Sequence, residues 1–350
     1  GELSALHTFV VGGDIRKPTY DISIGSLGAV LSRDDKDGGY KIEHIYRSDP
    51  DYLNVISPLA KPGLDIDDGD VITMVNGVST LSVPSPNKLL ENQVGQQVLL
   101  QLKSEKTGKE FQAVVTPISQ NQSADLRYSE WEYTRRLIVD KESNDSIGYV
   151  HLRAMGSGDI SQWVRDFYPV FNREGLIIDV RNNRGGNIDS WILEKLLRKA
   201  WMYWKPRAGK PIWNMQYAFR GHIVLLCNQF TASDGEAFTE GFKRLGLGKV
   251  IGMRTWGGEI WLSFDNRLLD DGIASAAELG VYGPGGHWLI EGHGVDPDIV
   301  VDNTPHITFD GHDAQLQEAI KYLMGEIKAH PVTVPPPPQY PDKAFNYGKH

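Results

Sequence analysis

From Ser146 onward, short apolar runs alternate with helical patterns, and this order limits the possible folds more than any other feature of the chain. Strand-like runs such as GLIIDV and HIVLLC are each followed by a helix-like stretch, IDSWILEKLLRKAW and GEAFTEGFKRL respectively. A repeated strand–helix order favours a largely parallel sheet with helices packed over it. The sequence therefore predicts an α/β domain over residues 146–330, closed by a helix in AQLQEAIKYLMGEI.

Ser233 lies where one of these strands, Ile223–Cys227, is expected to turn into a helix, Gly235–Arg244. A hydroxyl at such a junction is presented at the strand end, and the N–H groups at a helix N-terminus can stabilise an oxyanion. Ser233 is therefore a candidate nucleophile. The alternative is that Ser233 and Asp234 only cap the helix, as Ser and Asp commonly do.

The residues before this domain follow other patterns. Residues 21–119 read as five short strands with hairpin-type turns, plus two short helices in SPLAKPGL and SPNKLLENQ, which predicts a separate small domain. Residues 1–20 carry a short helical pattern, ELSALHTFV, which includes His7. Residues 120–145 are expected to be a polar linker that includes a helix, and residues 331–350 an extended proline-rich tail.

The composition excludes several classes of function. A net charge of −9 argues against nonspecific nucleic-acid binding, and no apolar run is long enough to span a membrane. The single cysteine, Cys227, excludes an intrachain disulfide and a cysteine-based zinc site, and a reducing compartment, the cytoplasm, is expected. No H-E-x-x-H zinc motif or G-x-x-x-x-G-K phosphate loop occurs, so neither a metal nor a cofactor is predicted.

Four segments together carry a family resemblance: DVRNNRGG, TASDGEAF, GMRTWGG and EGHGVDPDI. In this order they resemble tricorn-type serine peptidases and, more distantly, the carboxy-terminal processing peptidases. The segment SPLAKPGLDIDDGDVITMVNGVS resembles the middle of a PDZ domain. The resemblance covers nearly all of residues 1–330 and implies a multi-domain α/β fold. In it, a small PDZ β-sandwich or barrel with two helices precedes a peptidase core of crotonase-like fold.

The resemblance also implies roles for individual residues. Ser233 would be the nucleophile, His7 in ELSALH the general base, and Glu291 in LIEGHG the acid that orients the base. The N–H groups of Gly186 and Asp234 would form the oxyanion hole. Substrate contacts are expected at Gly185, Trp204, Trp256 and Gly257.

The chain departs from the family pattern at three positions. Gly258 stands where processing peptidases carry their catalytic lysine, which excludes a Ser–Lys mechanism. Leu6 replaces the serine that, in tricorn relatives, bridges the histidine to the glutamate. Trp204 stands where those relatives have an acidic residue, which favours apolar or aromatic substrate side chains. His293, two residues from Glu291, is a rival candidate for the base.

These observations predict a cofactor-free serine endopeptidase that cleaves peptides or unfolded proteins, with the PDZ domain capturing or gating substrate. PDZ domains add a peptide to a sheet edge, here expected at the strand Gly25–Arg33, although a module that binds no peptide is an open alternative. The resemblance implies a homo-oligomer such as a hexameric ring. The sequence begins without Met, and we expect it to be part of a longer chain.

Two other functions remain open on the sequence alone. The first is a noncatalytic peptide-binding protein that has kept the peptidase shell, which the replacement by Leu6 favours. The second is a crotonase-like acyl-CoA enzyme, because that fold also holds an oxyanion with paired N–H groups. The Ser233–Asp234 pair at a strand end and the PDZ-like segment argue against it.

Overall fold

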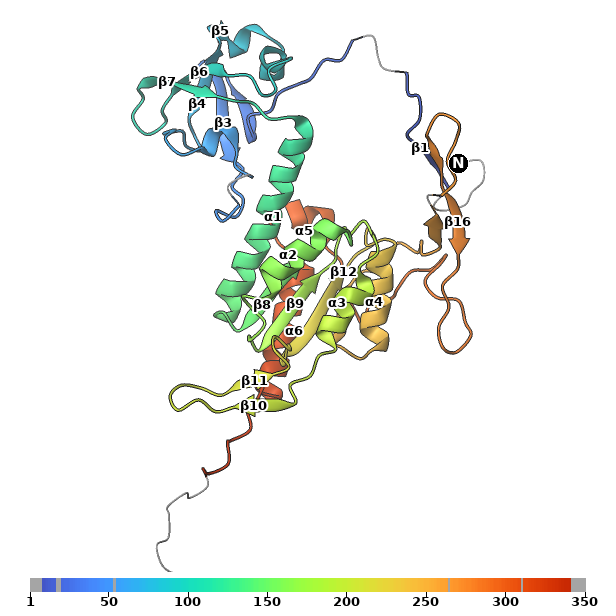
Figure 1. Ribbon diagram of the computed structural model, residues 1–350. Coiled ribbons are helices and arrows are strands. Elements are labelled where there is room, and N and C mark those ends of the chain that lie inside the picture. Colours follow the sequence, from blue (N-terminus) through green and yellow to red (C-terminus); the bar gives the residue numbers. More distant parts are fainter. Residues whose placement is uncertain (1–7, 17–19, 53–54, 264, 310, 341–350) are drawn as a thin grey trace, which may run out of the picture. The chain divides into compact units, whose positions relative to one another are not determined.

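The structure is a computed structural model that describes residues 8–16, 20–52, 55–263, 265–309 and 311–340. The chain divides into two compact units. Residues 15–137 form the unit expected to be a PDZ domain, here called the PDZ unit. The described parts of residues 1–14 and 138–350 form the unit expected to be a peptidase, here called the peptidase unit. Figure 1 traces both units along the chain. The helix expected within the linker is α1 (Gln120–Ser143), which takes up nearly all of residues 120–145, and the boundary between the units falls inside it.

The PDZ unit is built on an antiparallel sheet, which fits the short strands and hairpin-type turns predicted for it. Inward-facing residues of neighbouring strands, such as Ile42, Ile72 and Leu100, form its buried core. Alternating side chains bury one face of such a sheet and leave the other to solvent. The strands in sheet order are β2 (Ala29–Asp34), β3 (Gly39–Ile45), β4 (Val71–Val75), β6 (Val98–Lys103) and β7 (Glu110–Val115), with β5 (Val78–Ser79) paired to β4.

The two short helices expected in this unit are short 3₁₀ helices, and the unit contains another 3₁₀ helix between them in the sequence. Two of the three begin with a proline after a serine N-cap, Pro58 after Ser57 and Pro86 after Ser85, which sets the first turn but leaves too few residues for an α-helix. The three are η1 (Pro58–Ala60), η2 (Thr80–Ser82) and η3 (Pro86–Leu90).

Strand β2 lies at one edge of the PDZ sheet, where peptide addition is expected. The preceding loop packs against the first half of α1. The Ser26 hydroxyl donates to the Ser123 hydroxyl at 2.9 Å, and a side chain at Gly28 would lie 3.0 Å from Leu126. Glycine is favoured at residue 28 by its φ of +68° and by the Pro58 ring, whose Cδ would lie 2.9 Å from a Cβ at this position.

The peptidase unit contains a five-stranded sheet in which every pairing is parallel, as predicted. Parallel strands buried on both faces are typically near-continuous apolar runs, and GLIID and HIVLLC fit this description. In sheet order the strands are β17 (Ile299–Val300), β13 (Lys249–Gly252), β12 (His222–Cys227), β9 (Gly175–Asp179) and β8 (Ile147–His151).

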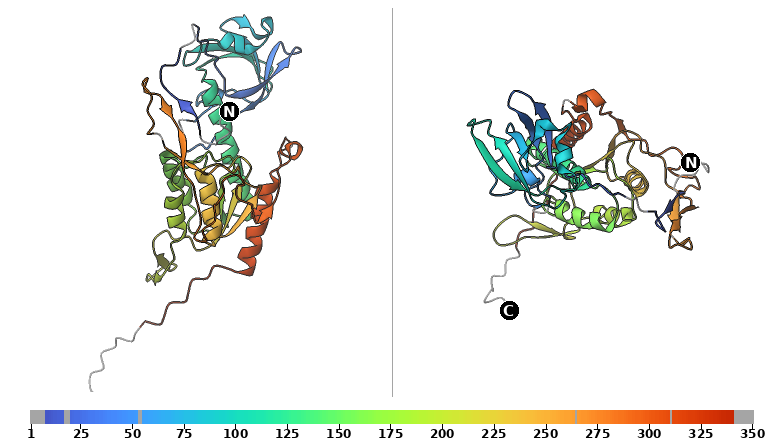
Figure 2. Two further views of the ribbon diagram at one scale, coloured as in Figure 1. Left: turned by 90° about the vertical axis from the view of Figure 1, so that its right-hand side faces the viewer. Right: turned by 90° about the horizontal axis from the view of Figure 1, so that it is seen from above.

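Helices cover both faces of this sheet (Figures 1 and 2). On β9, Leu176 and Ile178 pack into one core with residues of α2 (Ser157–Phe167), α3 (Asp189–Leu196) and α4 (Asp234–Arg244). Ile177 points to the other face, where it packs against α6 (Ala314–Ala329). A short helix, α5 (Pro305–Phe309), precedes α6. Because successive side chains of a strand point to opposite faces, β9 contributes residues to two cores.

Small antiparallel pairs extend from this unit. β10 (Met202–Trp204) pairs with β11 (Ile212–Asn214), β14 (Trp261–Ser263) with β16 (Ala276–Leu279), and β1 (Val10–Val11) with β15 (Ile273–Ala274). The helix expected in ELSALHTFV was therefore wrong at Val10, because this β-branched residue pairs with Ala274 in a strand. Residues 331–340 have no regular structure, as expected for a proline-rich tail.

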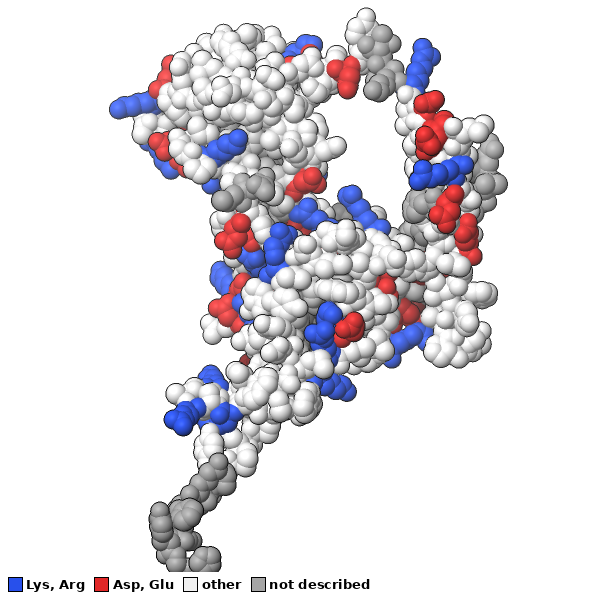
Figure 3. Space-filling view, viewed as in Figure 1, with Lys and Arg blue, Asp and Glu red and all other residues white. Residues whose placement is uncertain are grey.

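The surface of the described chain carries charges of both signs. Figure 3 shows Lys and Arg side chains interspersed with Asp and Glu over the face that it draws. Among the described residues, no helix is both long and apolar enough to cross a lipid bilayer.

Truncating Phe238 tests the core under α4. Its side chain is fully buried, so Phe238→Ala removes a ring from a packed interior and should lower the free energy of unfolding by about 3–5 kcal/mol. Val164→Ala is the matched control, because Val164 is 39% exposed on α2 and its truncation should change stability by less than about 0.5 kcal/mol. Urea unfolding followed by circular dichroism measures both. Equal stability of the two variants would contradict the core assignment.

Candidate active site

Ser233 occupies the turn between β12 and α4, as the sequence predicts. Its backbone has φ 53° and ψ −128°, a conformation that non-glycine residues rarely adopt and that clusters at functional sites. Within the described chain its hydroxyl makes no capping hydrogen bond to α4, and the Glu236 N–H donates instead to the Ser233 carbonyl at 2.7 Å. The simple capping role therefore does not account for this serine.

The loop after β9 lies directly against Ser233. Gly185 has φ +80°, and a Cβ at this position would lie 2.5 Å from the Ser233 Cβ and 3.0 Å from its Oγ. Only glycine fits such a contact. The loop is held by Asn183, whose carbonyl accepts from the Ala232 N–H and whose side-chain oxygen accepts from the Gly185 N–H, both at 2.9 Å. Asn183 was not identified from the sequence.

Two N–H groups near Ser233 are left without an acceptor. Beside Gly186, the Met155 N–H donates to the Gly185 carbonyl and the Asn187 N–H donates to the Met155 carbonyl, both at 2.8 Å. The Gly186 N–H between them has no acceptor among the described residues, and neither has the Asp234 N–H at the start of α4. Gly186 is exposed to solvent. A ligand oxygen can therefore approach the Gly186 N–H.

The Asp234 side chain does not cap its own helix. Its Oδ2 accepts from the N–H groups of Ile188 at 2.7 Å and Asp189 at 3.2 Å, and so joins the start of α3 to the start of α4. The carboxyl is fully buried, and burial together with the nearby Asp189 carboxylate raises its pKa to about 7. The positions of Gly186 and Ser233 therefore depend on one aspartate.

Glu236 holds the turn that contains Ser233 to a second segment of the chain. Its buried carboxylate accepts four hydrogen bonds: from the Ser233 N–H at 3.2 Å, the Thr255 hydroxyl at 2.6 Å, and the N–H groups of Gly257 at 2.6 Å and Gly258 at 2.9 Å. Sequence reasoning missed this residue. The signal was available, because a Glu three residues after a serine N-cap is a capping-box pattern.

Glu291 contacts the same segment, residues 255–260. Its Oε2 accepts from the N–H groups of Glu259 at 2.6 Å and Ile260 at 2.9 Å. Glu236 and Glu291 therefore hold this segment at its two ends. Trp256 and Gly257 lie within the segment; the Trp256 side chain is 47% exposed, and Gly257 has φ +97°. The structure thus joins most of the predicted site residues: Gly185, Gly186, Ser233, Asp234, Trp256, Gly257 and Glu291.

The two histidines considered as the general base are His7 and His293. His7 lies outside the described residues. His293, the rival, places its Nε2 2.7 Å from Asp296 Oδ2 and its Nδ1 3.5 Å from Arg254, and its side chain is 61% exposed. An exposed imidazole that already pairs with an aspartate and a neighbouring arginine has the character of a surface residue.

Trp204 was predicted to contact substrate, but within this chain it lies away from Ser233. It belongs to the β10–β11 hairpin, and Arg220, which packs on the rings of Tyr203 and Trp213, brings this hairpin to the start of β12. Ser233 follows the opposite end of β12, a six-residue strand about 20 Å long. Trp204 instead lines a groove of about 560 Å³ with the tail residues Pro335–Pro338. Trp204 and Ser233 therefore lie at opposite ends of β12.

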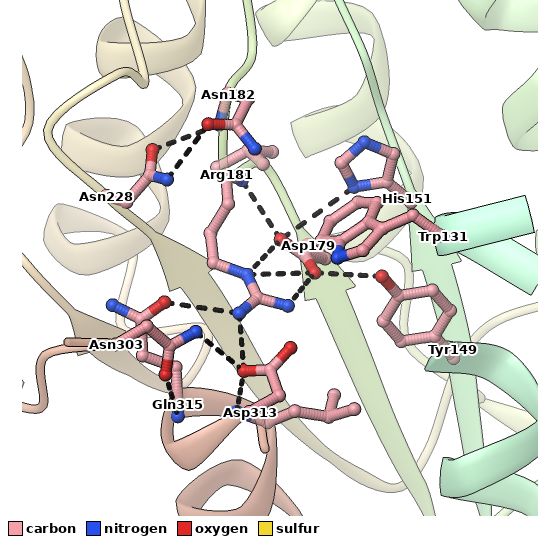
Figure 4. Close-up of polar contacts among 12 residues, drawn as sticks. Trp131, Tyr149, His151, Asp179, Arg181, Asn182, Asn228, Asn303, Asp313 and Gln315 are labelled. Atoms are coloured by element: carbon pink, nitrogen blue, oxygen red, sulfur yellow. Dashed lines mark hydrogen bonds and ion pairs between the residues drawn. The ribbon is translucent and has the colours of Figure 1, made fainter. Parts of the chain in front are cut away.

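A buried ionic network surrounds the end of β9 (Figure 4). Arg181 donates to Asp179 through Nε at 3.0 Å and Nη2 at 2.6 Å, and to Asp313 at 2.7 Å. Tyr149 donates to Asp179 at 2.8 Å. Burial alone would raise the pKa of the Asp179 carboxyl, but the Arg181 guanidinium and His151 lower it below its usual range. The network anchors the strand from which the Gly185–Gly186 loop departs.

Removing Asp313 tests this anchor. Asp313→Ala removes the charge-assisted hydrogen bond from Arg181 Nη1, while Arg181 keeps its pair with Asp179. It should lower the free energy of unfolding by about 1.5–3 kcal/mol, the range for hydrogen bonds to charged groups. The exposed Asp302→Ala is the matched control, with an expected change below about 0.5 kcal/mol. Thermal and urea unfolding at pH 7 measure both variants. A stable Asp313→Ala protein would show that the network does not anchor the strand.

The cysteine is not an alternative nucleophile. Cys227 is buried at the end of β12, and burial raises the pKa of its thiol to about 12. The thiolate is the reactive form, so this residue is inert near neutral pH. Among the described residues, no group of three His, Cys, Asp or Glu side chains is arranged to hold a metal ion.

Comparison with known proteins agrees with this geometry. Residues 146–301 match Peptidase family S41, and residues 25–120 match the Tricorn protease PDZ domain. The chain belongs to the tricorn branch of peptidase family S41. It is 35% identical over 341 residues to Tricorn protease homolog 1 of Streptomyces coelicolor, which covers 96% of this chain and 31% of the relative.

Further relatives give the same result. The chain is 36% identical over 332 residues to a putative tricorn-like protease C-terminal subunit of Sulfurisphaera tokodaii, covering 94% of this chain and 37% of the relative. A crystal structure of the tricorn protease superimposes with a TM-score of 0.84 at 30% identity, covering 94% of this chain and 31% of that one. The S41 chain described here therefore spans about a third of the length of these relatives.

Substituting Gly185 tests the contact between the loop after β9 and Ser233. In Gly185→Ala the new methyl group would displace Ser233, and we expect at least a ~100-fold lower rate of labelling by a serine-directed fluorophosphonate, comparable to losing an oxyanion donor. Gly209→Ala is the matched control, because Gly209 has φ +92° but no atom within 4 Å of its Cβ position. Equal labelling rates in the two variants would contradict the contact.

Proposed function

We propose that this chain is a cofactor-free serine endopeptidase that cleaves peptides or unfolded proteins with Ser233 as nucleophile. One observation carries the proposal. Ser233 occupies a strained turn between a strand and a helix, beside two N–H groups, of Gly186 and Asp234, that donate to no acceptor in the described chain. Strain at a turn and unused donors both cost stability, and both are expected where an oxyanion must be bound during catalysis.

Acylation would begin when a neutral imidazole removes the proton from the Ser233 hydroxyl, since a serine is a poor nucleophile without a base. We assign this role to His7, which would then donate the proton to the leaving amine. Glu291 would orient the imidazolium, as the third member of such an arrangement does. Because Leu6 replaces the bridging serine, Glu291 would act on His7 directly or through water.

The developing oxyanion would be held by the N–H groups of Gly186 and Asp234. This assignment is supported by their lack of other acceptors and by the helix N-terminus at Asp234, whose dipole favours negative charge. Substrate would lie along residues 255–260, past the exposed Trp256 ring and the Gly257 backbone.

We extend the proposal to substrate delivery, assembly and cellular location. The PDZ unit would deliver or gate peptide substrate at the edge of β2. We further propose a homo-oligomer, a hexameric ring, and a cytoplasmic location, by analogy with the tricorn relatives and on the single cysteine.

Covalent labelling tests the catalytic assignment. The protein, Ser233→Ala and His7→Ala are treated with a fluorophosphonate, and the intact mass of each is measured. One adduct on the unsubstituted protein is expected, with none on Ser233→Ala and a labelling rate at least ~100-fold lower on His7→Ala, because general-base catalysis contributes about that much. Hydrolysis of a fluorogenic peptide should fall in parallel.

The outcomes separate the alternatives. Labelling lost in Ser233→Ala but kept in His7→Ala would move the base to another residue, with His293→Ala as the next variant. No labelling of the folded, assembled protein would contradict the peptidase assignment and favour a peptide-binding shell. Turnover of an acyl-CoA without peptide cleavage would favour the crotonase-type chemistry instead.

A further inference from the structure

Glu259 carries a buried carboxyl group with no hydrogen-bond partner in the described chain. Its side chain is 2% exposed, and both oxygens, Oε1 and Oε2, are buried and unpaired. A buried charge without a partner costs far more than a buried neutral group, so an isolated acid of this kind is expected to hold its proton.

The groups around Glu259 reinforce this expectation. The negative charges of four other acidic residues disfavour its ionised form: Glu236 and Asp234 of α4, Asp189 of α3, and Glu291 of the loop before β17. Burial, then repulsion by Glu236, raises the pKa of Glu259 to about 9. Glu236 accepts four hydrogen bonds and is the better placed of the two to carry the negative charge.

The backbone of the same residue holds Glu291 in place. The Glu259 N–H donates to Glu291 Oε2 at 2.6 Å, and the Ile260 N–H donates to the same oxygen at 2.9 Å. A movement that carried the Glu259 side chain into solvent would rotate this backbone and break the contact with Glu291. The protonation of one side chain is thereby coupled to the position of another.

We propose that Glu259 is a positioning residue that acts only as a neutral acid. While protonated, its side chain stays buried among the four acidic neighbours and keeps residues 259–260 on the carboxylate of Glu291. Loss of the proton to solvent creates a second buried anion beside Glu236, expels the side chain and releases Glu291. The effect on catalysis rests on the proposed function, whereas the effect on stability does not.

The sign of the stability effect follows from linkage. In the unfolded chain Glu259 loses its proton near its ordinary pKa of 4.5, whereas the folded protein keeps it until the pKa of about 9. Between these values the folded state binds the extra proton, so this group lowers stability steadily as the pH rises. Above pH 9 both states are ionised and the dependence ends.

Thermal unfolding tests the stability effect without any need for activity. The Ser233→Ala protein is the parent in this experiment. Melting temperatures from pH 5 to pH 10 are measured for the parent and for the parent carrying Glu259→Gln, which mimics the neutral acid, or Glu259→Met. The exposed Glu278→Gln is the matched control. The melting temperature of Glu259→Gln relative to the parent should rise from pH 5 to about pH 9 and then level off, while Glu278→Gln stays parallel to the parent.

The labelling rate tests the catalytic effect. For an acid with a pKa of about 9, the protonated fraction falls about tenfold between pH 8 and pH 10, so labelling by the fluorophosphonate should fall about tenfold. In Glu259→Gln the ratio of the rates at pH 10 and pH 8 should be about tenfold higher than in the unsubstituted protein.

The results separate the two proposals. Parallel unfolding profiles for Glu259→Gln, Glu259→Met and the parent would overturn the assignment of Glu259. Diverging unfolding profiles in a protein that never labels would support the neutral buried acid and contradict the peptidase function. Labelling that falls at high pH equally in Glu259→Gln and the unsubstituted protein would overturn the link to Glu291.

Discussion

The rest of the site depends on the hydrogen bonds that the Glu236 carboxylate accepts. This carboxylate accepts hydrogen bonds from the turn at Ser233 and from three groups between Thr255 and Gly258. Each of its partners donates, so a glutamine at this position would direct an N–H toward another N–H and could not replace it. Through this one buried anion, the strained turn and the segment that contacts Glu291 become a single rigid body.

Other carboxyl groups near Ser233 have different roles because their surroundings differ. Asp234 is buried and joins two helix starts, Glu291 holds residues 259–260, and Glu259 has no partner at all among the described residues. Burial raises the pKa of Asp234 and Glu259, whereas the Arg181 network lowers that of Asp179. Burial therefore favours the protonated form of Asp234 and Glu259, whereas the guanidinium beside Asp179 favours its charged form.

Much of the fold could be predicted from local patterns. The strand β9, the helix α4 and the antiparallel sheet of the PDZ unit follow from periodicities of two and 3.6 residues, which depend only on side-chain direction. The sequence predictions were less successful where contacts with residues distant in the sequence determine the local structure. Val10 forms a strand because Ala274 is available for pairing, and Trp204 lies at the wrong end of β12 because a hairpin follows α3.

By itself the sequence determined the two domain types, the parallel sheet and the position of Ser233 at a strand–helix junction, because these depend on short stretches of chain. Only the tertiary structure decided which groups surround that serine. Asn183, Glu236 and Glu259 become important through contacts with residues that are distant in the sequence, and their hydrogen bonds, or the lack of them, arise when the loops after neighbouring parallel strands meet at one edge of the sheet.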